Sequence, residues 1–265
     1  MSVVATTWKA RQLTDNHRRR QVRLAAKSDS QIRRATALLD PKDIDATRDV
    51  WNAKMTQIVS QHHRVSEREA AAYLAQYRVA ELGSDFGPVI RPGVDVAATQ
   101  GVLDAVGPQG FKRRIAKGVP DLVAYQAMAR EVAAETRKLI LAGGRGVIRE
   151  SGAADGRAIG WRRVTGLDPC TFCAMLASRG PAYTSEAKAL AQGNGDPYHP
   201  HCGCSVEILY DDWVPTKQEE EFIDWYEAAA EEAEAVDGVR NQETVLWRMR
   251  ASGGARDSMS RRRKN

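Results

Sequence analysis

Cysteine and histidine residues are concentrated in one short stretch of this chain, and this concentration constrains the fold more than any other feature. The 265 residues include four Cys and five His, and six of these nine lie between positions 170 and 204. They occur in two elements, DPCTFC at residues 168–173 and HPHCGC at residues 199–204. Reactive side chains this dense in the sequence predict a site that ties separate segments of the fold together.

The spacing within the two elements is typical of metal ligands. Cys170 and Cys173 are separated by two residues, so a tight turn can direct both thiolates to one ion. Cys202 and Cys204 are two positions apart, and at the start of a strand both side chains point to the same face. His199 precedes Cys202 by another two-residue gap. Because a tetrahedral ion takes four ligands, we expect Cys170, Cys173 and Cys202, completed by either Cys204 or His199.

The predicted occupant of this site is one structural zinc ion per chain, which would contribute roughly 10 kcal/mol or more to folding. Four clustered Cys in a reducing compartment indicate metal before disulfide. One or two disulfides formed on exposure to air are the alternative, followed by free thiols. His201 is expected to be exposed. His17, His62 and His63 have no Cys or acidic partner at motif spacing, so we expect them at the surface or at helix ends.

Apolar side chains at helical spacing predict that most of the chain is helical. The predicted helices cover residues 44–63, 66–82, 96–106, 109–117, 120–142, 184–193 and 216–233. Ser66 with Glu69, and Thr216 with Glu219, have the pattern of capping boxes at helix starts. The glycine pair at residues 143–144 is predicted to end the long helix before it. Residues 1–30 lack a sustained apolar period, which indicates an arm or a loosely docked helix.

Two segments beside the cysteine elements have strand character. These are GWRRVTG at residues 160–166 and SVEILY at residues 205–210, in which apolar and polar side chains alternate. The fold class is therefore α+β and predominantly α-helical, with a helical N-terminal half. The C-terminal half is predicted to contain a small β element organised by the Cys/His cluster.

Charge is distributed unevenly along the chain, although the net charge is only +5. Residues 1–34 carry nine basic and two acidic side chains, residues 211–237 one basic and eleven acidic, and residues 238–265 eight basic and two acidic. Basic ends predict nonspecific contact with the phosphates of nucleic acid, and solvated tails that only maintain solubility are the alternative. The sequence contains no run of 18 apolar residues, so we expect neither a membrane span nor a signal peptide.

The two cysteine elements also carry a resemblance to a known family. WRRVTGLDPCTFCAMLASRGPAY at residues 161–183 and YHPHCGCSVEILY at residues 198–210 resemble the signature of the Mu F-like minor head proteins of tailed bacteriophages, in the version found in phages of actinobacteria. Its D-x-C-x-x-C and H-P-x-C-x-C elements are matched by Asp168, Cys170, Cys173, His199, Pro200, Cys202 and Cys204. The resemblance covers residues 120–210 and implies a minor capsid protein in the virion, associated with the portal and the inner head. It further implies contact with portal, major capsid or scaffold protein during head assembly, DNA packaging or ejection.

These features divide the chain into predicted segments. They are a basic arm at 1–31, a helical hairpin at 32–83, a hinge or linker at 84–95, a Mu F-like domain at 96–210 with the Cys/His knot at 168–204, an acidic amphipathic helix at 211–237 and a basic tail at 238–265. The acidic helix and the basic tail depart from many members of the family, so the resemblance implies no role for residues 211–265.

Two enzymatic alternatives follow from the same residues. Some phage relatives are labelled capsid maturation proteases, but a protease needs a nucleophile beside a base, and the four Cys are better explained as ligands. The sequence contains neither Gly-x-Ser-x-Gly nor His-Glu-x-x-His. A zinc-supported nuclease would use His199 or His201 to activate water, with Asp168 and Asp196 as the nearby carboxylates for a hydrolytic metal. We expect no catalytic residues and favour a structural and interaction protein.

Overall fold

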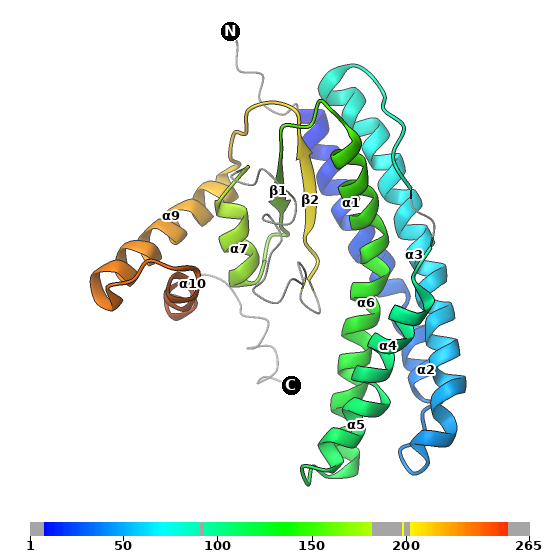
Figure 1. The fold of residues 1–265 in the computed structure, drawn as a ribbon. Helices are drawn as coiled ribbons and strands as arrows, with labels where there is room; N and C mark the ends of the chain where they lie inside the picture. Colours follow the sequence, from blue (N-terminus) through cyan, green and yellow to red (C-terminus); the bar gives the residue numbers. More distant parts are fainter. Residues whose placement is uncertain (1–7, 91–92, 182–197, 199–201, 254–265) are drawn as a thin grey trace.

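The computed structural model describes residues 8–90, 93–181, 198 and 202–253 (Figure 1). Its elements, in chain order, are α1 (Trp8–Lys27), α2 (Asp29–Thr36), α3 (Ile44–Leu82), α4 (Val96–Val106), α5 (Pro108–Ile115), α6 (Asp121–Ala154), β1 (Gly160–Val164), α7 (Thr171–Ser178), β2 (Ser205–Leu209), α9 (Lys217–Glu232), the π-helix η1 (Ala233–Asp237) and α10 (Gln242–Ala251). The predicted α+β fold class, mostly helical with a small β element in the C-terminal half, is confirmed. The predicted helix at residues 184–193 lies outside the described residues.

The long helices α3 and α6 pack side by side and form the centre of the helical part (Figure 1). Helix α3 is continuous over 39 residues, so the predicted break near His62 and His63 is wrong. Ser66 does not cap a helix but lies fully buried inside α3, where its hydroxyl donates to Gln21 Oε1 at 2.6 Å and accepts from the Gly144 backbone N–H at 2.9 Å. The polar residue that suggested a helix start therefore joins α3 to α1 and α6.

Helix α6 also continues past the position where the sequence predicted its end. It passes through Gly143 and Gly144 and ends at Ala154. A Cβ atom on Gly143 would lie 2.6 Å from the backbone carbonyl oxygen of His63, and one on Gly144 would lie 2.8 Å from Ser66 Oγ. The two glycines thus allow α3 and α6 to approach closely, a use of glycine that the local sequence does not distinguish from a helix stop.

Helix α1 is docked on α3 along its length, so the predicted basic arm at residues 1–31 contains a packed helix. The residues that α1 buries recur at helical spacing but are small or polar: Ala10, Thr14, His17, Gln21 and Ala25. Because they are weakly apolar, the sequence shows no hydrophobic stripe there. Hydrogen bonds replace it, for example between the hydroxyls of Thr14 and Tyr73 at 2.8 Å.

Two hydrophobic clusters share α3 and α6. One lies around the N-terminal halves of these helices and includes side chains of α2, α4 and α5, among them Ile32, Leu103 and Phe111. The other lies around their C-terminal halves and includes residues of the sheet, α7, α9 and α10. Residues 83–95, predicted to contain the hinge, connect α3 to α4, and their described part contains no helix or strand.

Strands β1 and β2 form an antiparallel pair that lies between α7 and the long helices (Figure 1). Both predicted strands are confirmed. Arg162 is paired in register with Glu207, and its Nε donates to Glu207 Oε1 at 2.6 Å. The same guanidinium bonds Glu219 at the start of α9, and all three side chains are buried. This ion network connects the sheet to the acidic helix.

The C-terminal part is a helical arm beside α7 (Figure 1). The predicted capping box of Thr216 and Glu219 is confirmed, since each residue bonds the other's backbone or side chain at the start of α9. Within the predicted basic tail, α10 folds back on α9 and buries Val245 and Met249, while residues 254–265 lie outside the described part. Among the described helices, none has the length and apolar character that crossing a membrane requires.

Candidate metal centre

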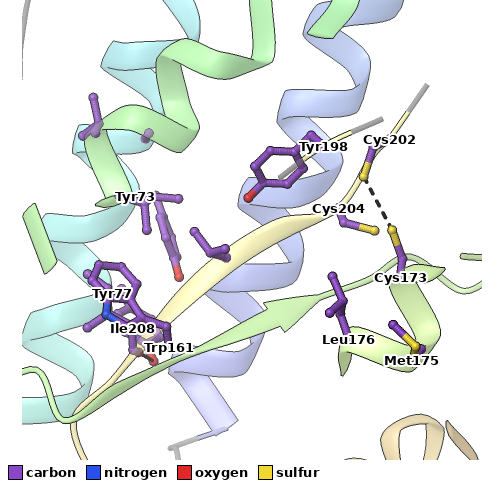
Figure 2. Packing of buried hydrophobic residues seen from close by; sticks show 14 of the residues in the cluster. Tyr73, Tyr77, Trp161, Cys173, Met175, Leu176, Tyr198, Cys202, Cys204 and Ile208 are labelled. Atoms are coloured by element: carbon purple, nitrogen blue, oxygen red, sulfur yellow. Dashed lines mark hydrogen bonds between the residues drawn. The ribbon is translucent and has the colours of Figure 1, made fainter. Parts of the chain in front are cut away.

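Three cysteines of the two elements meet in the interior, beside the start of β2 and the first turn of α7. Cys173 lies in that turn, and Cys202 and Cys204 lie in the segment that enters β2 (Figure 2). Their three sulfur atoms all lie within 4.8 Å of one another, and the three residues are 1–6% exposed. The fold thus brings together thiols that are separated by about 30 positions in the sequence.

The geometry of these sulfurs fits a metal ion. In a tetrahedral zinc site with Zn–S bonds of about 2.3 Å, two ligand sulfurs are about 3.8 Å apart. The Sγ atoms of Cys173 and Cys202 are 3.6 Å apart, and the four Cys are free thiols, so no disulfide links them. Soft thiolates in a closed buried group are the donor set of structural zinc sites. The cluster of Cys173, Cys202 and Cys204 is therefore suited to bind a metal ion.

The other predicted ligands have different positions. Cys170 is the N-cap residue of α7 and is half-buried; it is not part of the group of three, but its thiol is hydrogen-bonded to Cys173 and raises the pKa of Cys173. Of the two residues between which the sequence could not choose, Cys204 is in the cluster, whereas His199 lies outside the described residues, as do His201 and Asp196.

Two buried arginines support the cluster, and the sequence analysis did not identify them. Arg163 is 1% exposed, and its Nη1 lies 3.4 Å from the Cys173 sulfur and 3.8 Å from the Cys202 sulfur. Arg145 Nη2 donates to the backbone oxygens of Cys202 and Cys204, at 2.6 and 3.0 Å. The guanidinium of Arg145 also lies over the ring of Tyr198, 3.6 Å from its centroid. Arg163 thus contacts sulfur atoms of the cluster, whereas Arg145 holds the backbone of the segment that enters β2.

This environment favours the thiolate form of one of the three clustered residues, Cys202, whereas hydrogen bonds to neighbouring cysteines raise the pKa of Cys173. Hydrogen bonds from Cys173 and Cys204, together with the charges of Arg163 and Arg145, hold the pKa of Cys202 well below its usual value. Metal ions bind the thiolate form of cysteine. Positive charge beside the sulfurs stabilises that form and in this way favours metal binding. A signal for Arg163 was present in the sequence: in WRRV it is two positions from Trp161, which places both side chains on one face of the strand.

The remaining histidines lie elsewhere, and the surface position expected for His17 is wrong. His17 is buried at 4% exposure and stacks on Tyr73, with ring centroids 4.4 Å apart. His62 and His63 are half-buried within α3, not at a helix end; His63 Nδ1 is 2.9 Å from the Leu139 backbone oxygen. In the described part of the chain, none of the three belongs to the metal-binding group.

Comparison with known proteins identifies a family. A family model described as VG15 protein matches residues 9–232, which is most of the chain and includes the cysteine cluster. The chain belongs to this family, and membership points to a phage-encoded protein. No curated protein and no solved structure matches the chain.

Proposed function

We propose that this VG15 family member is a minor capsid protein of a phage head, with a structural role at the portal and the inner head during assembly, DNA packaging or ejection. The observation that carries the proposal is that cysteines of the D-x-C-x-x-C and H-P-x-C-x-C elements meet in one buried cluster, within a chain whose family points to phage. The resemblance of these elements to Mu F-like minor head proteins supplies the finer assignment.

The proposal includes one structural zinc ion held by Cys173, Cys202 and Cys204, with Cys170 as the fourth ligand. Cys170 is chosen because its thiol already contacts Cys173. The ion would join the start of α7 to the segment that enters β2. The guanidinium of Arg163 would offset the negative charge of the thiolates, since it contacts two of their sulfur atoms.

Metal analysis of protein purified under reducing conditions tests the zinc site. We expect one zinc per chain in the wild type, and its loss in Cys173→Ser and Cys204→Ser. His62→Ala removes a histidine outside the cluster and should keep the metal. Cys170→Ser should weaken zinc binding more than His199→Ala does, and the reverse order would assign the fourth position to His199. Protein without metal, or with a Cys173–Cys202 disulfide under the same conditions, would contradict the site.

A tagged copy expressed from the phage genome tests the capsid role. We expect the protein in purified heads at a few copies per particle and expect portal protein to co-purify with it. Deletion of the gene should reduce the yield of DNA-filled heads. Absence from purified particles, together with normal heads after deletion, would reject the proposal. If the purified protein cleaves capsid protein and Cys202→Ala abolishes the cleavage, a protease function would replace the proposed structural role.

Packaged DNA is the proposed partner of the exposed basic side chains on α1 and of the basic tail. On α1, five exposed basic side chains extend from one end to the other: Lys9, Arg19, Arg20, Arg23 and Lys27. Binding through phosphates should weaken steeply with salt. Neutralising Arg19, Arg23 and Lys27 to Gln should flatten that salt dependence, and so should deletion of residues 256–265 if the tail also contributes. An unchanged slope in both variants would leave these charges with a role in solubility only.

A further inference from the structure

A small pocket lies between α1, α6 and the segment that enters β2. Its lining consists of His17, Arg18, Gln21, Leu141, Arg145, Gly203, Cys204 and Ser205. The pocket has room for about one water molecule or an ion of similar size. Two of the lining side chains are arginines and none is a carboxylate. The pocket is therefore positively charged, and of the group of three sulfur atoms it shares Cys204.

Two nitrogen atoms of the lining side chains lack hydrogen-bond partners within the described ranges. They are His17 Nδ1 and Arg18 Nε, and both atoms are buried. The Arg18 Nε–H is always a donor, and a neutral histidine donates from one of its ring nitrogens. A buried donor without an acceptor costs on the order of 1–3 kcal/mol. Arg18 Nε, together with His17 Nδ1 in the tautomer that carries the ring proton there, points to an acceptor that the described residues do not supply.

The charges around the pocket favour an anion over a water molecule as that acceptor. Asp15 pairs with Arg18 at 3.0 Å but also with Arg19 at 2.6 Å, so one carboxylate serves two guanidiniums. The direct contacts of Arg145 are two carbonyl oxygens and the face of the Tyr198 ring, and the Cys202 thiol, on which its charge also acts, is shared with Arg163. A buried cation is most stable beside a negative charge, and the pocket is the space that both arginines line.

We infer that this pocket binds a chloride ion or another monatomic anion of that size, between His17 and Arg18 of α1 and Arg145 of α6. The size of the pocket excludes sulfate and phosphate, which have five heavy atoms. The bound ion would join three segments that are distant in sequence, and it would hold α1 against the segment that contains Cys204. Chloride would then stabilise the docking of α1 without taking part in the metal site.

A crystal grown with bromide in place of chloride tests the site directly. We expect an anomalous peak in the pocket, within hydrogen-bonding reach of Arg18 Nε and the His17 ring. The inference would be overturned if bromide bound at surface sites but the pocket showed density without an anomalous signal. Such density would identify a water molecule.

Thermal unfolding gives a second, independent measurement. Sodium chloride should raise Tm above the value in sodium gluconate at the same ionic strength, because gluconate is too large to enter, and the rise should saturate. His17→Phe keeps an aromatic ring beside Tyr73 but removes Nδ1, so its chloride-dependent rise should be lost. Arg23→Gln changes an exposed charge on the same helix and should keep the full rise. Equal Tm values of the wild type in the two salts, or an unchanged rise in His17→Phe, would overturn the inference.

Discussion

The close packing of α3 against α6 at Gly143 can be tested with two alanine substitutions in one helix. Gly143→Ala places a methyl group 2.6 Å from the backbone oxygen of His63, about 0.8 Å inside ordinary contact, whereas Gly146→Ala meets no atom within 4 Å. Both substitutions gain about 1 kcal/mol from helix propensity. Overpacking against backbone costs about 1–3 kcal/mol, because α3 cannot move away as a flexible side chain can.

The expected results differ in sign. Gly146→Ala should stabilise the protein by up to about 1 kcal/mol, and Gly143→Ala should destabilise it by up to about 2 kcal/mol after the propensity gain is subtracted. Urea unfolding followed by circular dichroism at 222 nm measures both, as opposite shifts of the midpoint. If Gly143→Ala were stabilised as much as Gly146→Ala, the two helices would not be in close contact there and the argument for a continuous, glycine-packed α6 would be refuted.

Three further predictions concern single side chains. Burial, followed by the charge of Arg20, lowers the pKa of His17 to about 4. The unfolded chain therefore binds the proton at a higher pH than the folded protein does, and the free energy of unfolding should fall by about 3 kcal/mol as the pH drops from 6.5 to 4. His17→Phe should flatten that part of the plot of unfolding free energy against pH, and an equally steep plot would contradict the prediction. Arg162→Met leaves two buried carboxylates unpaired and should cost about 3–5 kcal/mol in urea unfolding, whereas Arg149→Met, at an exposed site, should change stability by less than about 0.5 kcal/mol; similar values for the two would contradict the ion network. Thr216→Ala should cost about 1 kcal/mol and Thr216→Ser much less, and equal losses would show that the cap hydroxyl contributes nothing.

The predictions from sequence were accurate where the signal is local. The strands at 160–164 and 205–209 and the helix at 96–106 follow from alternation and apolar period, which depend on neighbouring residues. The capping box at Thr216 was confirmed because Glu219 bonds the cap through Oε2 and Arg162 through Oε1, so the tertiary contact leaves the cap in place.

The wrong predictions share one physical cause. In each, a tertiary contact uses a residue type that in other contexts marks a local feature such as a helix end. Ser66 has the residue type of a helix cap, but burial between α1 and α6 gives its hydroxyl other partners. Gly143 resembles a helix stop, but a close helix contact requires it. His17 lies in a highly charged segment, and only its stacking on Tyr73 explains its burial. None of these partners is within 40 positions in the sequence, so no local pattern could indicate them.

The candidate site was predicted in part. The meeting of Cys173 with Cys202 and Cys204 follows the expected spacing, whereas the roles of Arg145 and Arg163 beside the sulfurs were not foreseen. Arg145 directly follows the glycine pair at residues 143–144, which was predicted to end the helix. Because α6 continues through that stretch, Arg145 is carried to the cysteine segment, and the error in the helix boundary concealed the residue.

The continuity of α3 and α6 also determines how the molecule responds to force. Helix α3 is about 58 Å long and α6 about 51 Å, and both extend from one hydrophobic cluster to the other without a joint. A push applied at the α4–α5 end is therefore transmitted along two parallel rods to the sheet and the cysteine cluster. We therefore expect α3 and α6 to hold partners bound at the two ends at a set separation.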